Sequence, residues 1–332
     1  MRLWKIIAIA TVVECAAGAA LATVAGLFVG LSDWLDLLNH LAPIWFAVAI
    51  LSAPAAALLL PAGRARRAVV ALAVTAAVIS GAEVLPDAFA SLVSQGGHGN
   101  AKPLRVVTFN TWSDNTDPEA VVQRVRDARP DAAALIEMSW PMIHAGTKAL
   151  ASDLPYRTPG KHGCPADMIL MSKRPFTAYG CQVTYAPSRP DITETIVWGR
   201  TTAPDGRPFT LATTHYAWPF PHGGQAMQRP VLARFVRAHG DADMILTGDF
   251  NLTPWSFALK GQDHDLSPLT RRTHGVPTWP AMIARLNRPA PFAILPIDQI
   301  YAGKAWRTRS VTRLRRAGSD HLGLVAEFSR EP

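Results

Sequence analysis

Three long apolar runs mark the N-terminal part of the chain. They cover residues 6–31, 41–60 and 68–85, and only Glu14 and Glu83 place a charge within them. A helix needs roughly 20 apolar residues to cross a bilayer. Each run therefore predicts a transmembrane helix, and the third is the shortest. The alternative is a secretory signal followed by buried helices, which is harder to reconcile with three such runs.

The basic residues around these runs predict their orientation. Arg2 and Lys5 precede the first run, and the sequence GRARR separates the second from the third, whereas residues 32–40 contain two aspartates and no Lys or Arg. The positive-inside rule then puts the N-terminus in the cytoplasm. With three spans, everything after the third lies outside the cytoplasm; with two, it would lie inside.

A change of pattern divides the chain into an anchor, a linker and one further domain. We expect residues 1–90 to form the membrane anchor and the Gly-rich, polar residues 91–103 to form a linker. From residue 104 to 332, short apolar strands alternate with amphipathic helical segments, such as the one that begins with Asp117 as N-cap and Pro118 in the first turn. This alternation predicts an α/β domain.

The segment ILTGDFNLTPWS, residues 245–256, shows the pattern that recurs through this domain. We expect Gly248 to end an apolar strand, and the two-residue period places Asp249 and Asn251 on one face with Phe250 on the other. Thr253 and Pro254 then predict the start of a helix.

Polar side chains follow or end several other apolar segments in the same way. Each alone could cap a turn or face solvent. Together they supply carboxylate and amide oxygens of the kind that Mg²⁺ prefers, and a histidine beside aspartates that could act on a phosphoryl group. The full set is Asn110, Glu137, His215, Asp249, Asn251, Asp298, Asp320 and His321.

Two of the three cysteines lie in this domain. Cys164 and Cys181 flank a segment that we interpret as a strand, a turn near Pro175 and a returning strand. Such a hairpin would bring the two thiols together, so we expect either a disulfide or two free thiols, depending on the compartment.

The motifs VVTFNTW, LIE, THYAWP, TGDFNLTPWS, IDQI and SDHLGLVAEF occur in this order. In that combination the chain resembles the endonuclease/exonuclease/phosphatase superfamily, whose members include DNase I. With the N-terminal spans it is most similar to the membrane-anchored bacterial branch. The resemblance implies a DNase I-like fold, a four-layer αββα sandwich, preceded here by an all-α transmembrane segment of about three helices.

The resemblance also implies a divalent metal, Mg²⁺ or Mn²⁺. Glu137 matches the main metal-ligating glutamate of the family, with Asn110 beside it, and Asp320 matches a second acidic residue at the metal.

The remaining matches imply catalytic roles. Asp249 matches the aspartate that orients or deprotonates the attacking water, and Asn251 helps to hold the phosphate. His321 matches the histidine that contacts the scissile phosphate, and Asp298 is its carboxylate partner. His215 matches the histidine that binds the phosphate or assists the leaving group.

We therefore expect a metal-dependent phosphoric ester hydrolase, tethered to the bacterial cytoplasmic membrane with its catalytic domain on the periplasmic or extracellular side. The domain has 28 basic and 20 acidic residues from residue 101 onward, which suits a phosphate-bearing partner. A nuclease or phosphodiesterase, a phospholipid or phosphomonoester phosphatase, and a non-catalytic binding module remain open. The arginine-rich residues 307–316 could follow a phosphate backbone or face solvent. We expect the lipid bilayer as a partner and no obligate protein partner.

Overall fold

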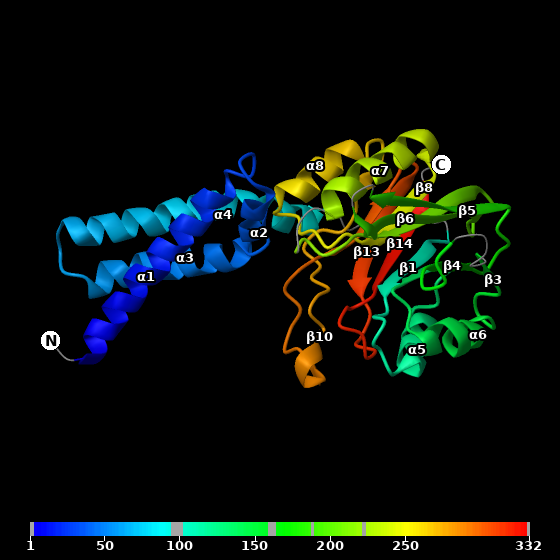
Figure 1. The fold of residues 1–332 in the computed structure, drawn as a ribbon, viewed down its shortest axis with the longest axis horizontal. Coiled ribbons are helices and arrows are strands. Elements are labelled where there is room, and N and C mark those ends of the chain that lie inside the picture. Colours follow the sequence, from blue (N-terminus) through cyan, green and yellow to red (C-terminus); the bar gives the residue numbers. More distant parts are fainter. Residues whose placement is uncertain (1–2, 94–101, 159–163, 187–188, 221–223, 331–332) are drawn as a thin grey trace. The chain divides into compact units, whose positions relative to one another are not determined.

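The computed structural model describes residues 3–93, 102–158, 164–186, 189–220 and 224–330. Two compact units are present. One comprises Met1–Phe89 with Thr253–Lys260, and the other comprises Ala90–Leu252 with Gly261–Pro332. The first is mainly helical, and the second contains all the strands and all the predicted site residues (Figure 1).

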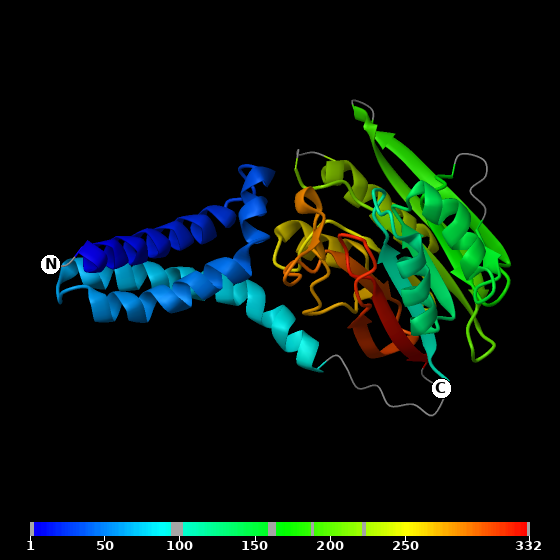
Figure 2. The same cartoon turned by 90° about the horizontal axis from the view of Figure 1, so that it is seen from below.

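The helical unit contains three long helices: α1 (Leu3–Gly26), α3 (Ala42–Leu59) and α4 (Arg64–Val93). The short η1 (Asp33–Leu35) and α2 (Asp36–Asn39) lie between α1 and α3. All three long helices are long and apolar enough to span a membrane. They run side by side in both ribbon views (Figures 1 and 2).

Small residues form the contacts among these helices. Ala19 and Ala20 of α1 pack with Ala49 of α3 and Ala76 of α4. Large apolar side chains point outward instead, and Leu58 is 84% exposed. Close approach through small residues is how helices associate in lipid, where burying leucine against another helix brings no hydrophobic gain.

Helix α4 is longer than the third apolar run predicted. It begins at Arg64 and continues to Val93, so it includes the first three residues of the predicted linker 91–103. Residues 94–101 of that linker lie outside the described residues. The helix continues through Pro86, and residues 87–93 extend it because none of them is a glycine or proline.

Two six-stranded mixed sheets form the centre of the second unit. The first has the order β13-β14-β1-β2-β4-β3 and the second β5-β6-β7-β8-β12-β9. The β1–β2 and β7–β8 pairs are parallel, whereas their other pairs are antiparallel. The first sheet consists of β1 (Leu104–Asn110), β2 (Ala132–Ile136), β3 (Tyr156–Arg157), β4 (Ile169–Ser172), β13 (Trp306–Arg313) and β14 (Leu324–Arg330). The second consists of β5 (Ala178–Ala186), β6 (Arg189–Thr202), β7 (Pro208–His215), β8 (Met244–Asp249), β9 (Thr270–Arg271) and β12 (Asp298–Ala302).

The helices of this unit are short. They are α5 (Pro118–Ala128), η2 (Met142–Gly146), α6 (Thr147–Leu150), α7 (Gly224–His239) and η3 (Ala284–Leu286), and a separate two-stranded ribbon pairs β10 (Met282–Ile283) with β11 (Arg288–Pro289). Helix α8 (Phe257–Asp265) begins in the first unit and ends in the second.

Burial on both faces of each sheet produces four layers. Between the sheets, Val106 and Leu170 of the first pack in one core with Leu211 and Ile245 of the second. On the outer face of the first sheet, a separate core joins β1 and β2 to α5 and α6. Helix α7 covers β5 and β6 of the second sheet (Figure 1). The predicted αββα sandwich is confirmed.

The structure corrects two local predictions around β8. Gly248 does not end the strand, because it pairs with Thr214 of β7 inside the ladder. A Cβ at Gly248 would lie 2.3 Å from the Thr214 carbonyl oxygen, so only glycine fits this close approach. The following helix begins at Phe257 rather than at Thr253, since Ser256 Oγ accepts a hydrogen bond from the Leu259 N–H and acts as its cap.

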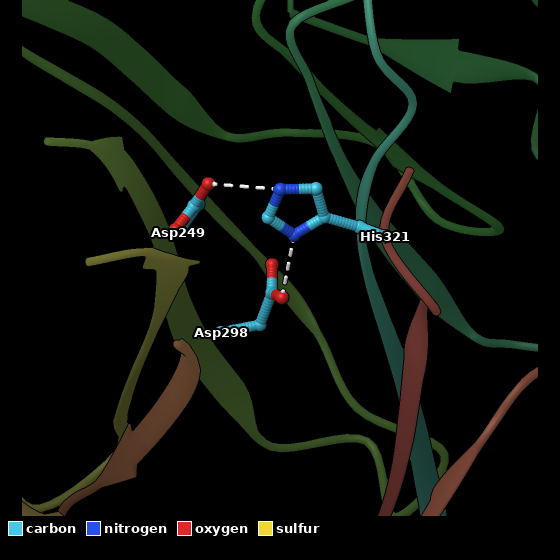
Figure 3. Close-up of side chains that lie close together, drawn as sticks. All are labelled: Asp249, Asp298 and His321. Atoms are coloured by element: carbon cyan, nitrogen blue, oxygen red, sulfur yellow. Dashed lines mark hydrogen bonds and ion pairs between the residues drawn. The ribbon is translucent and has the colours of Figure 1, made fainter. Parts of the chain in front are cut away.

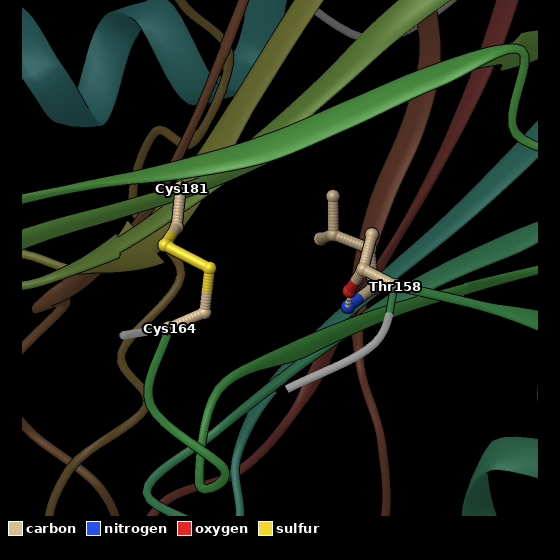
Figure 4. Close-up of a disulfide and its surroundings, with 4 residues drawn as sticks. Thr158, Cys164 and Cys181 are labelled. Carbon is tan, nitrogen blue, oxygen red and sulfur yellow. Dashed lines mark hydrogen bonds between the residues drawn. A yellow bond between two sulfur atoms is a disulfide. The ribbon is translucent and has the colours of Figure 1, made fainter. Parts of the chain in front are cut away.

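Cys164 and Cys181 form a disulfide with a Cα–Cα distance of 5.7 Å (Figure 4). The predicted hairpin between them is wrong. Strand β4 pairs with β2 and β3 in the first sheet, whereas β5 pairs with β6 in the second. The segment around Pro175 passes from one sheet to the other, so the disulfide links the loop before β4 to the second sheet.

Candidate active site

The ends of the central strands bring the predicted residues to one edge of the sandwich. In the second sheet, Asp249 at the end of β8 is in register with His215 of β7 and with Asp298 of β12. In the first sheet, Asn110 ends β1, and Glu137 directly follows the parallel strand β2. Parallel neighbours end at the same edge, which explains why residues 27 positions apart meet.

His321 lies between two aspartates of the second sheet (Figure 3). Its Nδ1 is 2.8 Å from Asp298 Oδ2, and its Nε2 is 3.5 Å from Asp249 Oδ2. All three side chains are at most 3% exposed. The close Asp298 contact fixes the orientation of the ring and leaves Nε2 directed toward the Asp249 carboxylate.

Burial and mutual charge set the protonation of this group. Burial acts to lower the pKa of His321, but the charges of Asp298 and Asp249 outweigh it and raise that pKa to about 10. Burial raises the pKa of Asp249 to about 6, against the opposing effect of His321. At neutral pH, His321 is thus an imidazolium, and Asp249 is a carboxylate in the range useful for a general base.

Asn110 connects the carboxylates of the two sheets. Its Nδ2 donates to Glu137 Oε2 at 2.7 Å and to Asp249 Oδ2 at 3.0 Å, while its Oδ1 accepts from the Trp112 N–H. His215 Nε2 lies 3.8 Å from both carboxylates. A metal bond through Asn110 Oδ1, as the sequence predicts, requires the amide to rotate.

Two features of the described residues fit a divalent cation. Asp320 Oδ1 is buried without a hydrogen-bond partner among them. Burial raises the pKa of Asp320 against the opposing charge of His321 and the hydrogen bond from Trp279, and the charge of Glu137 raises it further. Asp320 Oδ1 meets the charge of His321 at 4.0 Å from Nε2, and a hard cation would bind this oxygen directly.

Asp249, Asp298 and His321 also hold their ligand atoms within 4.8 Å of one another. This group does not include Glu137 and Asp320, the predicted metal ligands. A protonated His321 has no lone pair for a metal, and both of its ring nitrogens already face carboxylates.

Backbone conformation distinguishes two of the site residues. Glu137 has φ 53° and Asn251 has φ 48°, both in the left-handed region. At Asn251 this turn lets the backbone N–H donate to Asp249 Oδ1 at 2.9 Å, while Nδ2 donates to the Tyr216 carbonyl. Asp249 and Asn251 therefore share one side through a turn, while Phe250 is fully buried.

Two supporting residues had no role in the sequence analysis. Ser319 Oγ donates to the Asn110 carbonyl and accepts from the His321 N–H, so it ties the last loop to the end of β1. Trp279 Nε1 donates to Asp320 Oδ2 at 3.2 Å, and exposed Trp218 packs edge-on against the Trp279 ring. The position of Ser319 directly before an Asp-His pair is a local signal of its role. Nothing in the neighbouring sequence indicates the role of Trp279.

The family model described as Endonuclease/Exonuclease/phosphatase family matches residues 107–321, most of the second unit. The chain belongs to this family. Its members are metal-dependent hydrolases of phosphoester bonds in substrates such as nucleic acids. A comparison with curated proteins found no significant match.

Solved structures of low identity share the fold. A family member from Beutenbergia cavernae is 20% identical, with TM-score 0.54 over 69% of this chain and 72% of that one. Mannosyl-6-phosphatase Bt3783 of Bacteroides thetaiotaomicron is 15% identical, with TM-score 0.53 over 68% and 99%. TDP2 of D. rerio, in complex with a single-strand DNA product, is 16% identical, with TM-score 0.53 over 69% and 100%.

Proposed function

We propose that this chain is a membrane-tethered phosphodiesterase of the nuclease type that works outside the cytoplasm. The observation that carries the proposal is the buried Asp298–His321–Asp249 group beside the carboxylates of Glu137 and Asp320. A binding module needs phosphate donors but has no use for a buried carboxylate whose pKa of about 6 suits proton transfer.

Each residue then has a defined task. Glu137 and Asp320 would hold Mg²⁺ or Mn²⁺, and the bound ion would polarise the phosphoryl oxygen and neutralise its charge. Asp249 aligns a water and accepts its proton as the water attacks phosphorus. His321 donates from Nε2 to a phosphoryl oxygen, and Asp298 keeps it protonated and oriented.

Two residues hold Asp249 in position, and a third acts on the substrate. Asn251 and Asn110 hold the position of Asp249 through their hydrogen bonds to its two carboxylate oxygens. His215 is 28% exposed and faces both Glu137 and Asp249, so we assign it to the phosphate or to the leaving oxygen.

The proposed compartment rests on two independent features. Three membrane-length helices with basic residues before the first and between the second and third support an external catalytic domain. The Cys164–Cys181 disulfide supports an oxidising compartment. Protease treatment of intact spheroplasts should degrade the catalytic domain, whereas protection until the membrane is lysed would place it in the cytoplasm.

The proximity of lipid gives one alternative substrate. The anchor favours a phospholipid, and a phosphomonoester is the other alternative. The neighbours that share the fold include both a phosphatase and a protein bound to DNA. The substrate must therefore be tested directly.

The test uses the purified full-length chain in detergent with Mg²⁺ or Mn²⁺. Plasmid DNA, single-stranded DNA, a bis-aryl phosphodiester, sphingomyelin and a phosphoinositide are offered in parallel. We expect metal-dependent cleavage of the phosphodiester and of DNA, lost in Asp249→Ala and kept in the exposed control Asp153→Asn. Cleavage of a lipid alone would select the alternative, and metal binding without any turnover would indicate a binding module.

A further inference from the structure

A basic pocket outside the candidate active site adjoins the loop that carries Asp320 and His321. Its volume is about 610 Å³, and it is lined by Arg124, Arg313, Arg315 and Arg316, with Phe292 and Leu322 among its apolar residues. No acidic residue is among the described residues that line it. The pocket therefore has a strongly positive surface that is separate from the carboxylates of the active site.

The four arginines differ in how much of their bonding capacity is used. Arg316 Nε donates to the Ala281 carbonyl, and its Nη2 donates to the Ala290 carbonyl. Arg313 donates once, to the Pro277 carbonyl at 3.2 Å. Exposed Arg315 has no hydrogen bond or ion pair within the described part of the chain. Arg315 and most of the Arg313 guanidinium are thus free to bind an anion.

One residue, Ala281, connects this pocket to the active site through its two backbone polar groups. The Ala281 N–H donates to the Asp320 carbonyl, and the Ala281 carbonyl accepts from Arg316. Leu322, which lines the pocket, directly follows His321 and donates its N–H to the Thr278 carbonyl. A substrate extended from the reacting phosphate along this loop would reach the arginines.

The aromatic residue at the pocket narrows the class of ligand. Phe292 is 68% exposed, and it stands beside arginines whose planar groups bind phosphate in a bidentate manner. An exposed ring next to guanidinium groups is the arrangement that binds a base and its phosphate in single-stranded nucleic acid. A bare phosphate or a lipid headgroup would use the arginines and leave the ring without a partner.

We propose that this pocket binds a nucleotide next to the cleaved bond of a single-stranded polynucleotide. Its non-scissile phosphate lies on Arg315 and Arg313, and its base stacks on Phe292. The inference rests on the proposed phosphodiesterase function and names the substrate class of that site.

Binding is measured by fluorescence anisotropy with a labelled oligothymidylate and the full-length chain in detergent, in an Asp249→Asn background. Arg315→Gln with Arg313→Gln should raise Kd about tenfold and lower the slope of log K against log salt by about one for each lost phosphate contact. Arg234→Gln with Arg237→Gln on α7, where both arginines are exposed, is the charge-matched control. Equal effects of the control and the pocket variants would overturn the proposal.

A second variant separates base from phosphate. Phe292→Ala should weaken binding of the oligothymidylate about fivefold or more but leave an abasic oligomer of the same length unaffected. Equal loss for both oligomers would overturn the stacking assignment. If the pocket variants instead lose binding only to phosphoinositide vesicles, the ligand is a lipid headgroup and the nucleotide assignment is wrong.

A separate activity assay tests the proposed function independently of the pocket. The wild-type chain should hydrolyse a bis-aryl phosphodiester that is too small to reach the pocket, and the absence of this activity would contradict the phosphodiesterase assignment. The anisotropy experiment does not depend on turnover, so it decides the pocket proposal in either case.

Discussion

Replacing Asp298 by asparagine tests the centre of the proposed site. The substitution keeps the shape of the side chain but removes the charge that lies 2.8 Å from His321 Nδ1, with both side chains 3% exposed. An asparagine amide can still accept from the ring, so packing is preserved. The charge of Asp298 is the main one that raises the pKa of His321, so this pKa falls in the variant. The ring then loses the Nε2 proton that we propose donates to the phosphate.

The magnitude follows from the separation and burial of the pair. Unit charges about 4 Å apart attract by about 4 kcal/mol at the effective dielectric constant of a protein. Loss of one preorganised contact of this kind raises barriers by about 2.7–4 kcal/mol. We therefore expect kcat/KM to fall by a factor of about 10² to 10³.

The assay is hydrolysis of a bis-aryl phosphodiester by the full-length protein at saturating Mg²⁺. A thermal melt of the same sample shows whether the variant is folded, and Asp153→Asn controls for the loss of one exposed carboxylate. A folded Asp298→Asn protein that keeps kcat/KM within about threefold of wild type would refute the role given to the pair.

Three further changes probe other parts of the molecule. Glu137→Gln removes a proposed metal ligand, so the Mg²⁺ concentration for half-maximal activity should rise at least about tenfold in a metal titration, and an unchanged titration would exclude the assignment. Fully buried Glu194 has one unpartnered oxygen among the described residues, and burial raises its pKa well above its ordinary range. Between the ordinary pKa and the raised pKa of the folded state, only the folded state holds the proton, so the free energy of unfolding falls as pH rises, by about 1.36 kcal/mol per unit. Glu194→Gln should flatten this decline when the free energy of unfolding is measured at several pH values. The same pH dependence in the two proteins would argue against it. Cys164→Ser opens a loop of sequence separation 17 and should lower the free energy of unfolding by about 3 kcal/mol in denaturant titrations; no change would show that the bond does not constrain the unfolded chain.

Much of the fold was predictable because its signals are local. Apolar runs and strand-to-helix alternation identify the helices and an α/β domain, and the polar strand ends identify residues as far apart as Asn110 and His321. The four layers follow from the family resemblance instead. The position of each strand in a sheet is not local. The residues between Cys164 and Cys181 read as a hairpin, yet β4 and β5 lie in different sheets, because their partners come from distant parts of the chain.

The detailed geometry of the candidate site shows the same division. Nothing in the residue types near Glu137 indicates its left-handed backbone, and the Trp279–Asp320 hydrogen bond joins loops 41 residues apart. The prediction that Gly248 ends the strand is wrong because a glycine within a strand has the same local signature as one that ends it. Only the approach of the Thr214 carbonyl distinguishes the two cases.

The left-handed backbone at Glu137 and Asn251 has a consequence for engineering and for evolution. Each such residue costs of the order of 1–3 kcal/mol relative to an unstrained one, so the site works against the stability of the domain that holds it. Glycine at either position would relax the chain and abolish a functional side chain. A library selected only for thermal stability should therefore lose these two residues early, and a copy of this domain that no longer needs to turn over substrate should do the same.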